Sequence, residues 1–144
     1  MVNKIGINDI DKFYELGLLV NSNFENLFNL KELLNNKYDY IFGYYDNNIL
    51  VGFIHVNKLY ENMDIINIVV DKDYRRRGIG NKLINYVVNE FSDVDSIMLE
   101  VNVNNTEAIN LYNVNKFKVI HKRLNYYGED DALIMKRDVK NERC

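Results

Sequence analysis

Residues 63–91 read MDIINIVVDKDYRRRGIGNKLINYVVNEF, and this stretch indicates how the chain folds. Residues 63–70 are largely apolar and rich in Ile and Val, which favours a strand buried on both faces. Residues 81–91 instead carry apolar side chains at helical spacing, which predicts an amphipathic helix. Those side chains are Leu83, Ile84, Val87, Val88 and Phe91. The stretch therefore reads as a strand, a glycine-containing loop and a helix.

The loop between that strand and that helix has the features of an anion site. Residues 75–81 are R-R-R-G-I-G-N. Glycines at positions 78 and 80 permit positive φ and lack a Cβ, so successive backbone N–H groups can converge on one point. The N-terminus of the following helix adds unsatisfied donors and a partial positive charge, and the three arginines can contact phosphate oxygens. A pyrophosphate would fit this loop.

A short Gly-x-Gly also has a plainer explanation, which is a tight turn beside a solvated arginine surface. The loop lacks the third glycine and the later acidic residue of the dinucleotide fingerprint. It also lacks the Gly-Lys-Ser/Thr ending of a P-loop, which argues against ATP or GTP hydrolysis. From the loop alone, the turn and the phosphate site both stay open.

Hydrophobic periodicity outside this stretch predicts helices and strands in a mixed order. Helices are expected over residues 10–20 and 27–35, and again from Asn105 or Thr106 through Asn113. The other segments alternate or are rich in β-branched and aromatic residues, which predicts strands at 2–7, 40–45, 49–59, 96–103, 117–126 and 132–136. The order β-α-α-β-β-β-α-β-α-β-β indicates an α/β fold class, a mixed sheet with helices on both sides.

Composition and charge exclude several classes of protein. The chain has 144 residues, 47% of them hydrophobic, and a net charge of −3, which fits a single domain over residues 1–144. Without an overall basic field, neither nucleic acid nor a membrane is an expected partner. No apolar run reaches the roughly 18 residues of a spanning helix. The single cysteine, Cys144, cannot form an internal disulfide or a metal site by itself. We expect a cytoplasmic protein, with structural roles for His55 and His121.

Two residues after the loop carry side chains suited to proton transfer. Glu100 interrupts an alternating apolar strand, and Tyr112 lies in the helix that follows. Each has an ordinary explanation: a solvent-facing position for Glu100, and core packing beside Ala108 and Leu111 for Tyr112. From the residues alone, the ordinary explanation is favoured for both.

Three sequence blocks together resemble a known family. They are VDKDYRRRGIG at 70–80, LEVNVNNTEAINLY at 99–112 and RLNYYGEDDALIM at 123–135. These blocks and their spacing resemble the GNAT superfamily of N-acetyltransferases, and within it the bacterial ribosomal-protein-alanine N-acetyltransferases. The resemblance covers residues 65–136, half of the chain. It implies the GNAT fold, with a central mixed, mostly antiparallel sheet of about seven strands and helices on both faces.

The resemblance also implies roles for individual residues. Glu100 matches the family's general base and Tyr112 its general acid, while Tyr126 and Tyr127 would line the entrance for a peptide acceptor. The remaining residues would hold acetyl-CoA, with the loop at the pyrophosphate and the strand at the pantetheine. They are Ile68, Val69, Val70, Arg75, Arg76, Arg77, Gly78, Ile79, Gly80, Asn81 and Asn105.

The chain departs from the family pattern at three places. Lys116-Phe117 stands where members usually have Gly-Phe, so we expect Asn115 to end the preceding helix in the left-handed conformation. Asn102 stands where members usually have Arg, and residues 23–25 replace a common Pro-Trp. The last two departures fall in regions that could help shape an acceptor groove.

The implied activity is transfer of an acetyl group from acetyl-CoA to a primary amine by direct attack in a ternary complex, with no metal. We expect the N-terminal α-amine of a protein, such as a ribosomal protein. Its pKa of roughly 7.7–8.0 supplies the neutral amine more readily near pH 7 than a lysine at about 10.4. The alternatives are a small-amine or lysine acetyltransferase and a non-catalytic acyl-CoA-binding sensor. The presence of Glu100 and Tyr112 favours an enzyme over a sensor, and the sequence does not predict the oligomeric state.

Overall fold

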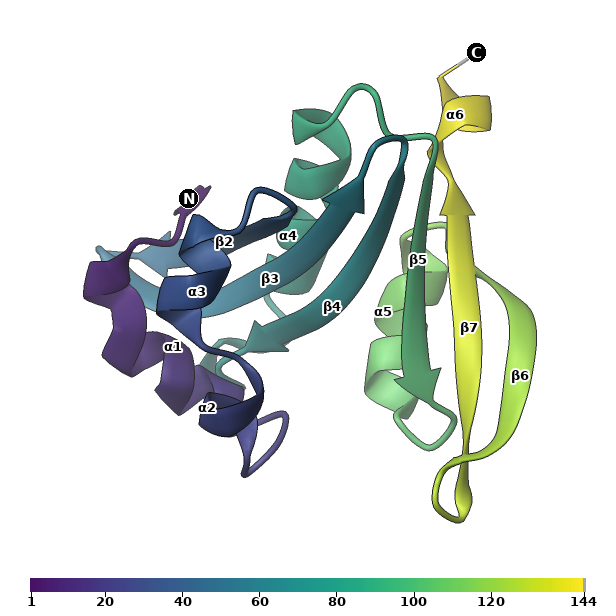
Figure 1. Ribbon diagram of the computed structural model, residues 1–144, viewed down its shortest axis with the longest axis horizontal. Helices are drawn as coiled ribbons and strands as arrows, with labels where there is room; N and C mark the ends of the chain where they lie inside the picture. The colour runs from purple at the N-terminus through teal and green to yellow at the C-terminus, as the bar shows by residue number, and fades with distance from the viewer. Residues whose placement is uncertain (144) are drawn as a thin grey trace.

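The computed structural model describes residues 1–143, which form a seven-stranded sheet with helices on both faces (Figure 1). The strand order is β1-β2-β3-β4-β5-β7-β6. The strands are β1 (Val2–Lys4), β2 (Asp39–Asp46), β3 (Ile49–Leu59), β4 (Asn62–Val70), β5 (Ser96–Asn102), β6 (Lys118–Tyr127) and β7 (Asp130–Asp138). The predicted fold class and mixed sheet are confirmed. Cys144 lies outside the described residues.

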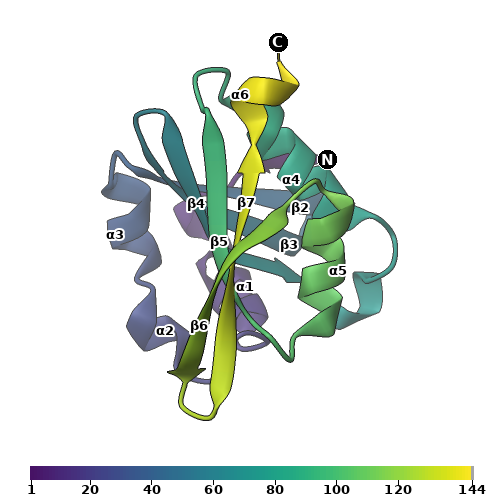
Figure 2. The same ribbon diagram turned by 90° about the vertical axis from the view of Figure 1, so that its right-hand side faces the viewer.

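The helices lie between groups of these strands, with three of them in succession between β1 and β2. They are α1 (Ile10–Gly17), α2 (Phe24–Leu27), α3 (Leu30–Asn35), α4 (Ile79–Glu90), α5 (Thr106–Val114) and α6 (Val139–Glu142), with 3-10 turns η1 (Ile7–Asp9) and η2 (Lys72–Tyr74). In Figure 2, α4 and α5 lie on one side of the strands, whereas α2 and α3 lie on the other. Each face of the sheet therefore has its own apolar core.

The parallel pairing of β4 with β5 is short, while the other neighbouring strands pair antiparallel. Its register runs only from Asn62 opposite Ser96 to Asp64 opposite Met98. Beyond Asp64 the two strands diverge, as Figure 1 shows. The C-terminal half of β4 therefore has β3 on one edge and no strand on the other.

Helix α1 ends at Gly17, so the predicted helix over 10–20 is too long. A Cβ at Gly17 would overlap the ring of Phe24, which is fully buried. This close approach of a distant ring has no signature in the local period. As a result, Leu19 and Val20, which the predicted helix includes, are 37% and 48% exposed.

The predicted helix over 27–35 is two short helices, α2 and α3. Phe28 between them has an extended backbone. The side chain of Asn29 then caps α3 by accepting a hydrogen bond from the Glu32 backbone N–H at 3.0 Å. Asparagine competes for backbone hydrogen bonds in this way and so favours caps over helix interiors.

Helix α4 begins at Ile79, two residues earlier than predicted. Only the first glycine of the loop has positive φ, since Gly78 caps the helix at φ 76°. Gly80 lies inside the helix, where a Cβ would be 3.1 Å from the Leu111 side chain. Gly80 therefore does not use the positive φ that glycine permits, and its missing Cβ instead lets α4 approach α5.

The end of α5 also differs from expectation. Lys116, not Asn115, adopts the left-handed conformation, at φ 68°. Asn115 is buried, and its Nδ2 donates to the Asn81 Oδ1 at 2.6 Å and to the Leu111 carbonyl at 2.8 Å. Asn115 therefore ties the first turn of α4 to α5.

The apolar sequence of β4 predicted a strand buried on both faces. This prediction is wrong, because one face is partly exposed. In its first half, Met63 and Ile65 are buried, whereas Asp64 and Ile66 are exposed. On β5 the predicted alternation is correct: Leu99 and Val101 are buried and Glu100 is exposed. One outward face of these two strands is therefore open to a ligand.

Candidate active site

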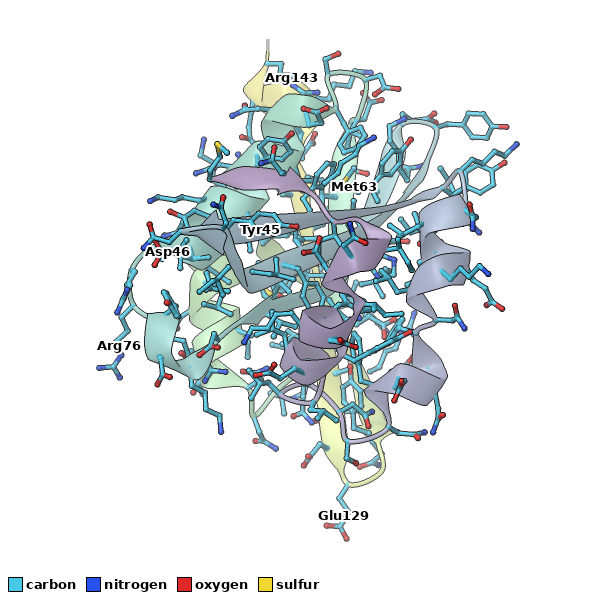
Figure 3. The ribbon with its side chains drawn as sticks, turned by 90° about the vertical axis from the view of Figure 1, so that its left-hand side faces the viewer. Tyr45, Asp46, Met63, Arg76, Glu129 and Arg143 are labelled. Carbon is cyan, nitrogen blue, oxygen red and sulfur yellow. The ribbon has the colours of Figure 1, made fainter. Side chains whose placement is uncertain are left out.

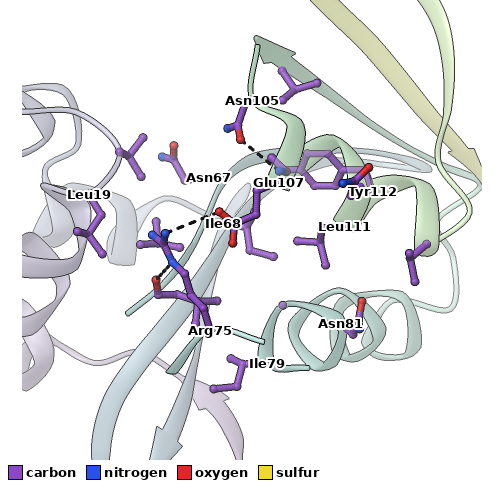
Figure 4. A pocket seen from close by; sticks show the side chains of 18 of the residues that line it. Leu19, Asn67, Ile68, Arg75, Ile79, Asn81, Asn105, Glu107, Leu111 and Tyr112 are labelled. Carbon is purple, nitrogen blue, oxygen red and sulfur yellow. Dashed lines mark hydrogen bonds and ion pairs between the residues drawn. The ribbon is translucent and has the colours of Figure 1, made fainter. Parts of the chain in front are cut away.

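The divergence of β4 and β5 produces a cleft of about 890 Å³ (Figure 4). Its walls come from the end of β4, the loop after it, the start of α4, the end of β5 and α5. All of the residues predicted for the site except Arg77 and Tyr126 line this cleft. The lining members are Ile68, Val69, Val70, Arg75, Arg76, Gly78, Ile79, Gly80, Asn81, Glu100, Asn105, Tyr112 and Tyr127.

The first turn of α4 is the anion-binding part of the cleft. Its cap, Gly78, has no side chain to accept a hydrogen bond. The first bond inside the helix runs from the Lys82 N–H to the Gly78 carbonyl at 3.0 Å. The N–H groups of residues 79–81 therefore precede the intrahelical ladder. Together with the helix dipole they favour a negatively charged group at this end of the cleft.

The three arginines of the loop take different directions. Arg75 turns into the cleft, where its Nε donates to the Val70 carbonyl at 3.2 Å and its Nη1 lies 3.8 Å from Glu107 Oε2 (Figure 4). Arg76 has φ 63° and projects into solvent (Figure 3). Arg77 lies over the ring of Tyr74, 4.8 Å from its centroid. The structure does not gather all three guanidinium groups at one point.

The end of β4 offers backbone groups to the cleft. Val70 pairs with Gly52 and Ile68 with Ile54 across the antiparallel edge with β3. The opposite edge has no strand beyond Asp64, so alternate N–H and C=O groups there face the cleft. An extended ligand can pair with such an edge in the way that an added strand does.

The candidate acid and base come from different elements. Tyr112 on α5 is only 6% exposed, and its ring packs edge-on against Phe117 at 5.8 Å between centroids. This burial raises the pKa of Tyr112 to about 12, so the phenol keeps its proton at neutral pH. Glu100 on β5 is exposed, and its Oε1 lies 2.9 Å from Nη1 of Arg123. The cleft thus holds one protonated donor and one carboxylate acceptor.

Two further groups, one carboxyl and one phenol, have a pKa that the charge of Glu100 affects. Partial burial of the Asp64 carboxyl raises its pKa, although the residue remains exposed overall. The charge of Glu100 raises this pKa further. The pKa of Tyr127 is likewise raised, first by partial burial and then by Glu100 and Tyr126. Strands β4, β5 and β6 therefore direct acidic groups toward one region.

The sequence reading missed several lining residues. Leu19 and Val20 line the cleft, and Glu107 pairs with Arg75. Asn67 also lines the cleft, at the irregularity in register where β3 and β4 pair around His55. Its Nδ2 is buried without a hydrogen-bond partner among the described residues. The sequence did contain a signal for Asn67, because it is the polar residue in the apolar run I-I-N-I-V-V. It lies at a bulge, and bulges turn side chains toward functional sites.

Residues 1–143 contain neither a helix suited to span a membrane nor a cluster of side chains suited to bind a metal ion. No helix there is long and apolar enough to cross a membrane. No three His, Cys, Asp or Glu side chains in the same part of the chain cluster as a metal site requires.

The chain is similar to several known proteins. It is 34% identical over 95 residues to the [ribosomal protein bS18]-alanine N-acetyltransferase of Escherichia coli K12. That alignment covers 62% of this chain and spans only 64% of the length of the relative. The crystal structure of the ribosomal-protein-S18-alanine N-acetyltransferase from Escherichia coli matches 96% of this chain and 93% of its own, with a TM-score of 0.83 and 24% identity.

A second similar structure contains a bound ligand. The putative streptothricin acetyltransferase of Bacillus anthracis, in complex with acetyl coenzyme A, has a TM-score of 0.69 and 26% identity. The match covers 75% of this chain and 66% of that one. The model of the acetyltransferase (GNAT) family matches residues 7–117, well over half of the chain. By this match and by its fold, the chain belongs to the GNAT family of acetyltransferases.

Proposed function

We propose that the protein is an acetyl-CoA-dependent N-acetyltransferase whose acceptor is the N-terminal α-amine of a protein. The observation that carries the proposal is that one cleft is lined by the anion-binding turn of α4, the Glu100 carboxylate and the Tyr112 phenol. A non-catalytic acyl-CoA sensor would need the first of these but not the other two.

The two ends of the cleft suit the two ends of acetyl-CoA. Backbone N–H groups at the start of α4 would bind the pyrophosphate, and the free edge of β4 would pair with the pantetheine arm. Asn105 uses its Oδ1 to accept the Ala108 N–H at 3.2 Å, which leaves its amide nitrogen for the cofactor arm. The Bacillus anthracis structure with acetyl coenzyme A supports this choice of co-substrate.

The chemistry needs a proton acceptor, a proton donor and an oxyanion donor. Glu100 would accept the proton of the amine, directly or through water, as the C–N bond forms. A backbone N–H at the end of β4, among residues 68–70, would donate to the thioester oxygen as negative charge develops there. Tyr112 would give its proton to the departing thiolate, which suits a phenol that burial keeps protonated. Much of the acceleration would come from holding both substrates in one cleft.

The choice of a protein α-amine rests on the relatives and on the entrance. The Escherichia coli relative is named for acetylating an alanine of ribosomal protein bS18. In this chain, apolar side chains of Leu19, Val20, Ile66 and Tyr127 border the acceptor side, which suits an extended peptide better than a small polar amine. A ribosomal protein is the acceptor we propose, in the cytoplasm where such proteins are made.

The acceptor is tested by measuring CoA-thiol release from acetyl-CoA with two sets of peptides. One set begins with free Ala, Ser or Met, and the other has a blocked N-terminus and contains lysine. We expect turnover with the free N-termini only. Turnover with blocked lysine peptides alone would overturn the α-amine assignment and favour a lysine acetyltransferase instead.

The acid and base are tested with conservative variants. Glu100→Gln and Tyr112→Phe should each lower kcat by roughly 100-fold or more, with the acetyl-CoA dissociation constant unchanged. Glu61→Gln and Tyr60→Phe are matched controls, because they make the same chemical changes in the β3–β4 turn, at the far end of β4 from the cleft. Full turnover in both Glu100→Gln and Tyr112→Phe would refute the assigned roles.

A further inference from the structure

Glu100, the carboxylate that the acceptor amine would need, already forms an ion pair with an arginine of the chain. Arg123 on β6 places its Nη1 2.9 Å from Oε1 of Glu100, with the two side chains 46% and 35% exposed. The guanidinium also lies over the ring of Tyr126, 5.3 Å from the centroid. Arg123 is therefore held at the acceptor end of the cleft by one ion pair and one ring.

The two partners of this ion pair differ in how firmly the fold holds them. Glu100 lies in the middle of β5, paired with Ile134 on β7 and flanked by buried residues. Arg123 lies on the edge strand β6, in which every residue is exposed. The register between β6 and β7 is irregular after Arg123, and Asn125 has positive φ at 53°. The base is thus rigid, whereas the arginine can leave without disturbing the core.

The groups around Glu100 favour a positively charged side chain beside it. Partial burial raises the pKa of Asp64 on β4 and of Tyr127 on β6, and the charge of Glu100 raises both further. The neighbouring cation on β6, Lys122, pairs instead with Asp131 at 3.3 Å. Arg123 is accordingly the basic side chain that the structure pairs with this acidic region.

We propose that Arg123 is a positioning residue that occupies Glu100 while the acceptor site is empty and is displaced by the acceptor's own ammonium group. This inference rests on the proposed function. Near pH 7 an α-amine with a pKa of roughly 7.7–8.0 arrives mostly as a cation. It exchanges for the guanidinium on Glu100, and Glu100 then lies beside the nitrogen whose proton it must accept. An exposed ion pair of this kind is weak enough to exchange, since such pairs contribute little to stability.

The exchange predicts a change in the acceptor KM without a change in kcat. Arg123→Ala removes the competitor and should lower the KM for a peptide beginning with free alanine by about two- to fivefold, the range expected for an exposed ion pair. Arg123→Lys keeps a cation on Glu100 and should stay near the wild-type KM. The KM for acetyl-CoA should be unchanged in both variants.

Lys122→Ala is the matched control, because it removes the same charge from the same strand at a side chain that pairs with Asp131. It should leave the acceptor KM unchanged. An equal fall in KM for Arg123→Ala and Lys122→Ala would mean that overall charge, not occupation of Glu100, sets the affinity. A rise in KM for Arg123→Ala would mean that Arg123 helps to bind the acceptor. Either result would overturn the proposal.

A second readout does not depend on turnover. The side-chain Nε–H signal of Arg123 in ¹⁵N NMR is assigned by its loss in Arg123→Lys. With CoA present, added alanine amide should shift this signal, whereas N-acetylalanine amide should not. No shift at saturating alanine amide refutes the displacement. If instead the signal shifts but no peptide is acetylated, the displacement stands and the proposed function fails.

Discussion

Gly78 and Gly128 make a matched pair for testing whether the loop before α4 holds acetyl-CoA. Gly78 caps α4 at φ 76°, and Gly128 lies in the β6–β7 turn at φ 71°. A Cβ added to either would meet no heavy atom within 4 Å. Alanine at each position therefore introduces backbone strain without a steric clash, but only one of the two positions belongs to the anion-binding turn.

The expected loss of stability is similar for the two variants. A left-handed conformation costs an alanine roughly 1–2 kcal/mol. Part of this is offset by the lower entropy of alanine in the unfolded chain, about 0.4–1 kcal/mol. The net cost is about 1 kcal/mol, which for a chain of 144 residues lowers Tm by about 3 °C. Differential scanning calorimetry measures this shift.

The effect on acetyl-CoA should differ between them. Relief of the strain at residue 78 turns the peptide N–H groups that point into the cleft. Loss of one hydrogen bond to a charged phosphate costs about 1.5 kcal/mol, which corresponds to roughly tenfold weaker binding. Isothermal titration with acetyl-CoA should show this loss for Gly78→Ala and wild-type affinity for Gly128→Ala. Unchanged affinity in Gly78→Ala, at the expected loss of stability, would refute the role of the loop.

Two other predictions concern stability. Gly17→Ala should lower the free energy of unfolding in urea by about 1–3 kcal/mol, because the new methyl overlaps the enclosed ring of Phe24. Gly6→Ala, at φ −112° and with no atom within 4 Å, is the control, and equal effects in the two variants would refute the packing argument. Burial lowers the pKa of His55, so below the unfolded value of about 6.5 the unfolded chain binds a proton that the folded chain does not. Folding stability should therefore fall as pH drops below about 6.5, by at most about 1.4 kcal/mol per pH unit. Urea unfolding at pH 7.5 and 5.5 should show a steeper fall for wild type than for His55→Gln, and equal falls would mean that His55 does not contribute.

Local sequence patterns predicted the strands and helices that follow a clean period. The alternation of β5 put Glu100 on the exposed face, as the structure has it. The strand, loop and helix of residues 63–91 are present in the predicted order. Hydrophobic periodicity predicts these helices and strands correctly because each of them buries one regular face. The spacing of the apolar residues therefore indicates which side chains are buried.

The predictions failed where a contact from another part of the chain decides the conformation. Gly17 ends α1 beside the ring of Phe24, and Gly80 lies in α4 because Leu111 of α5 packs against it. Neither contact leaves a local pattern in the sequence. For the same reason the sequence did not indicate that Leu19 and Val20, placed in the predicted helix over residues 10–20, line the cleft.

The sequence by itself determined the order of the seven strands, the two helices α4 and α5 between them and the family, because these depend on residue types at short spacing. Only the tertiary structure decided that β4 and β5 separate after Asp64, which opens the cleft between them. It also decided that Arg75 turns toward Glu107 and that Arg123 occupies Glu100. These contacts join residues 32 and 23 positions apart along the chain, and they form only because the sheet and its helices bring separate segments together.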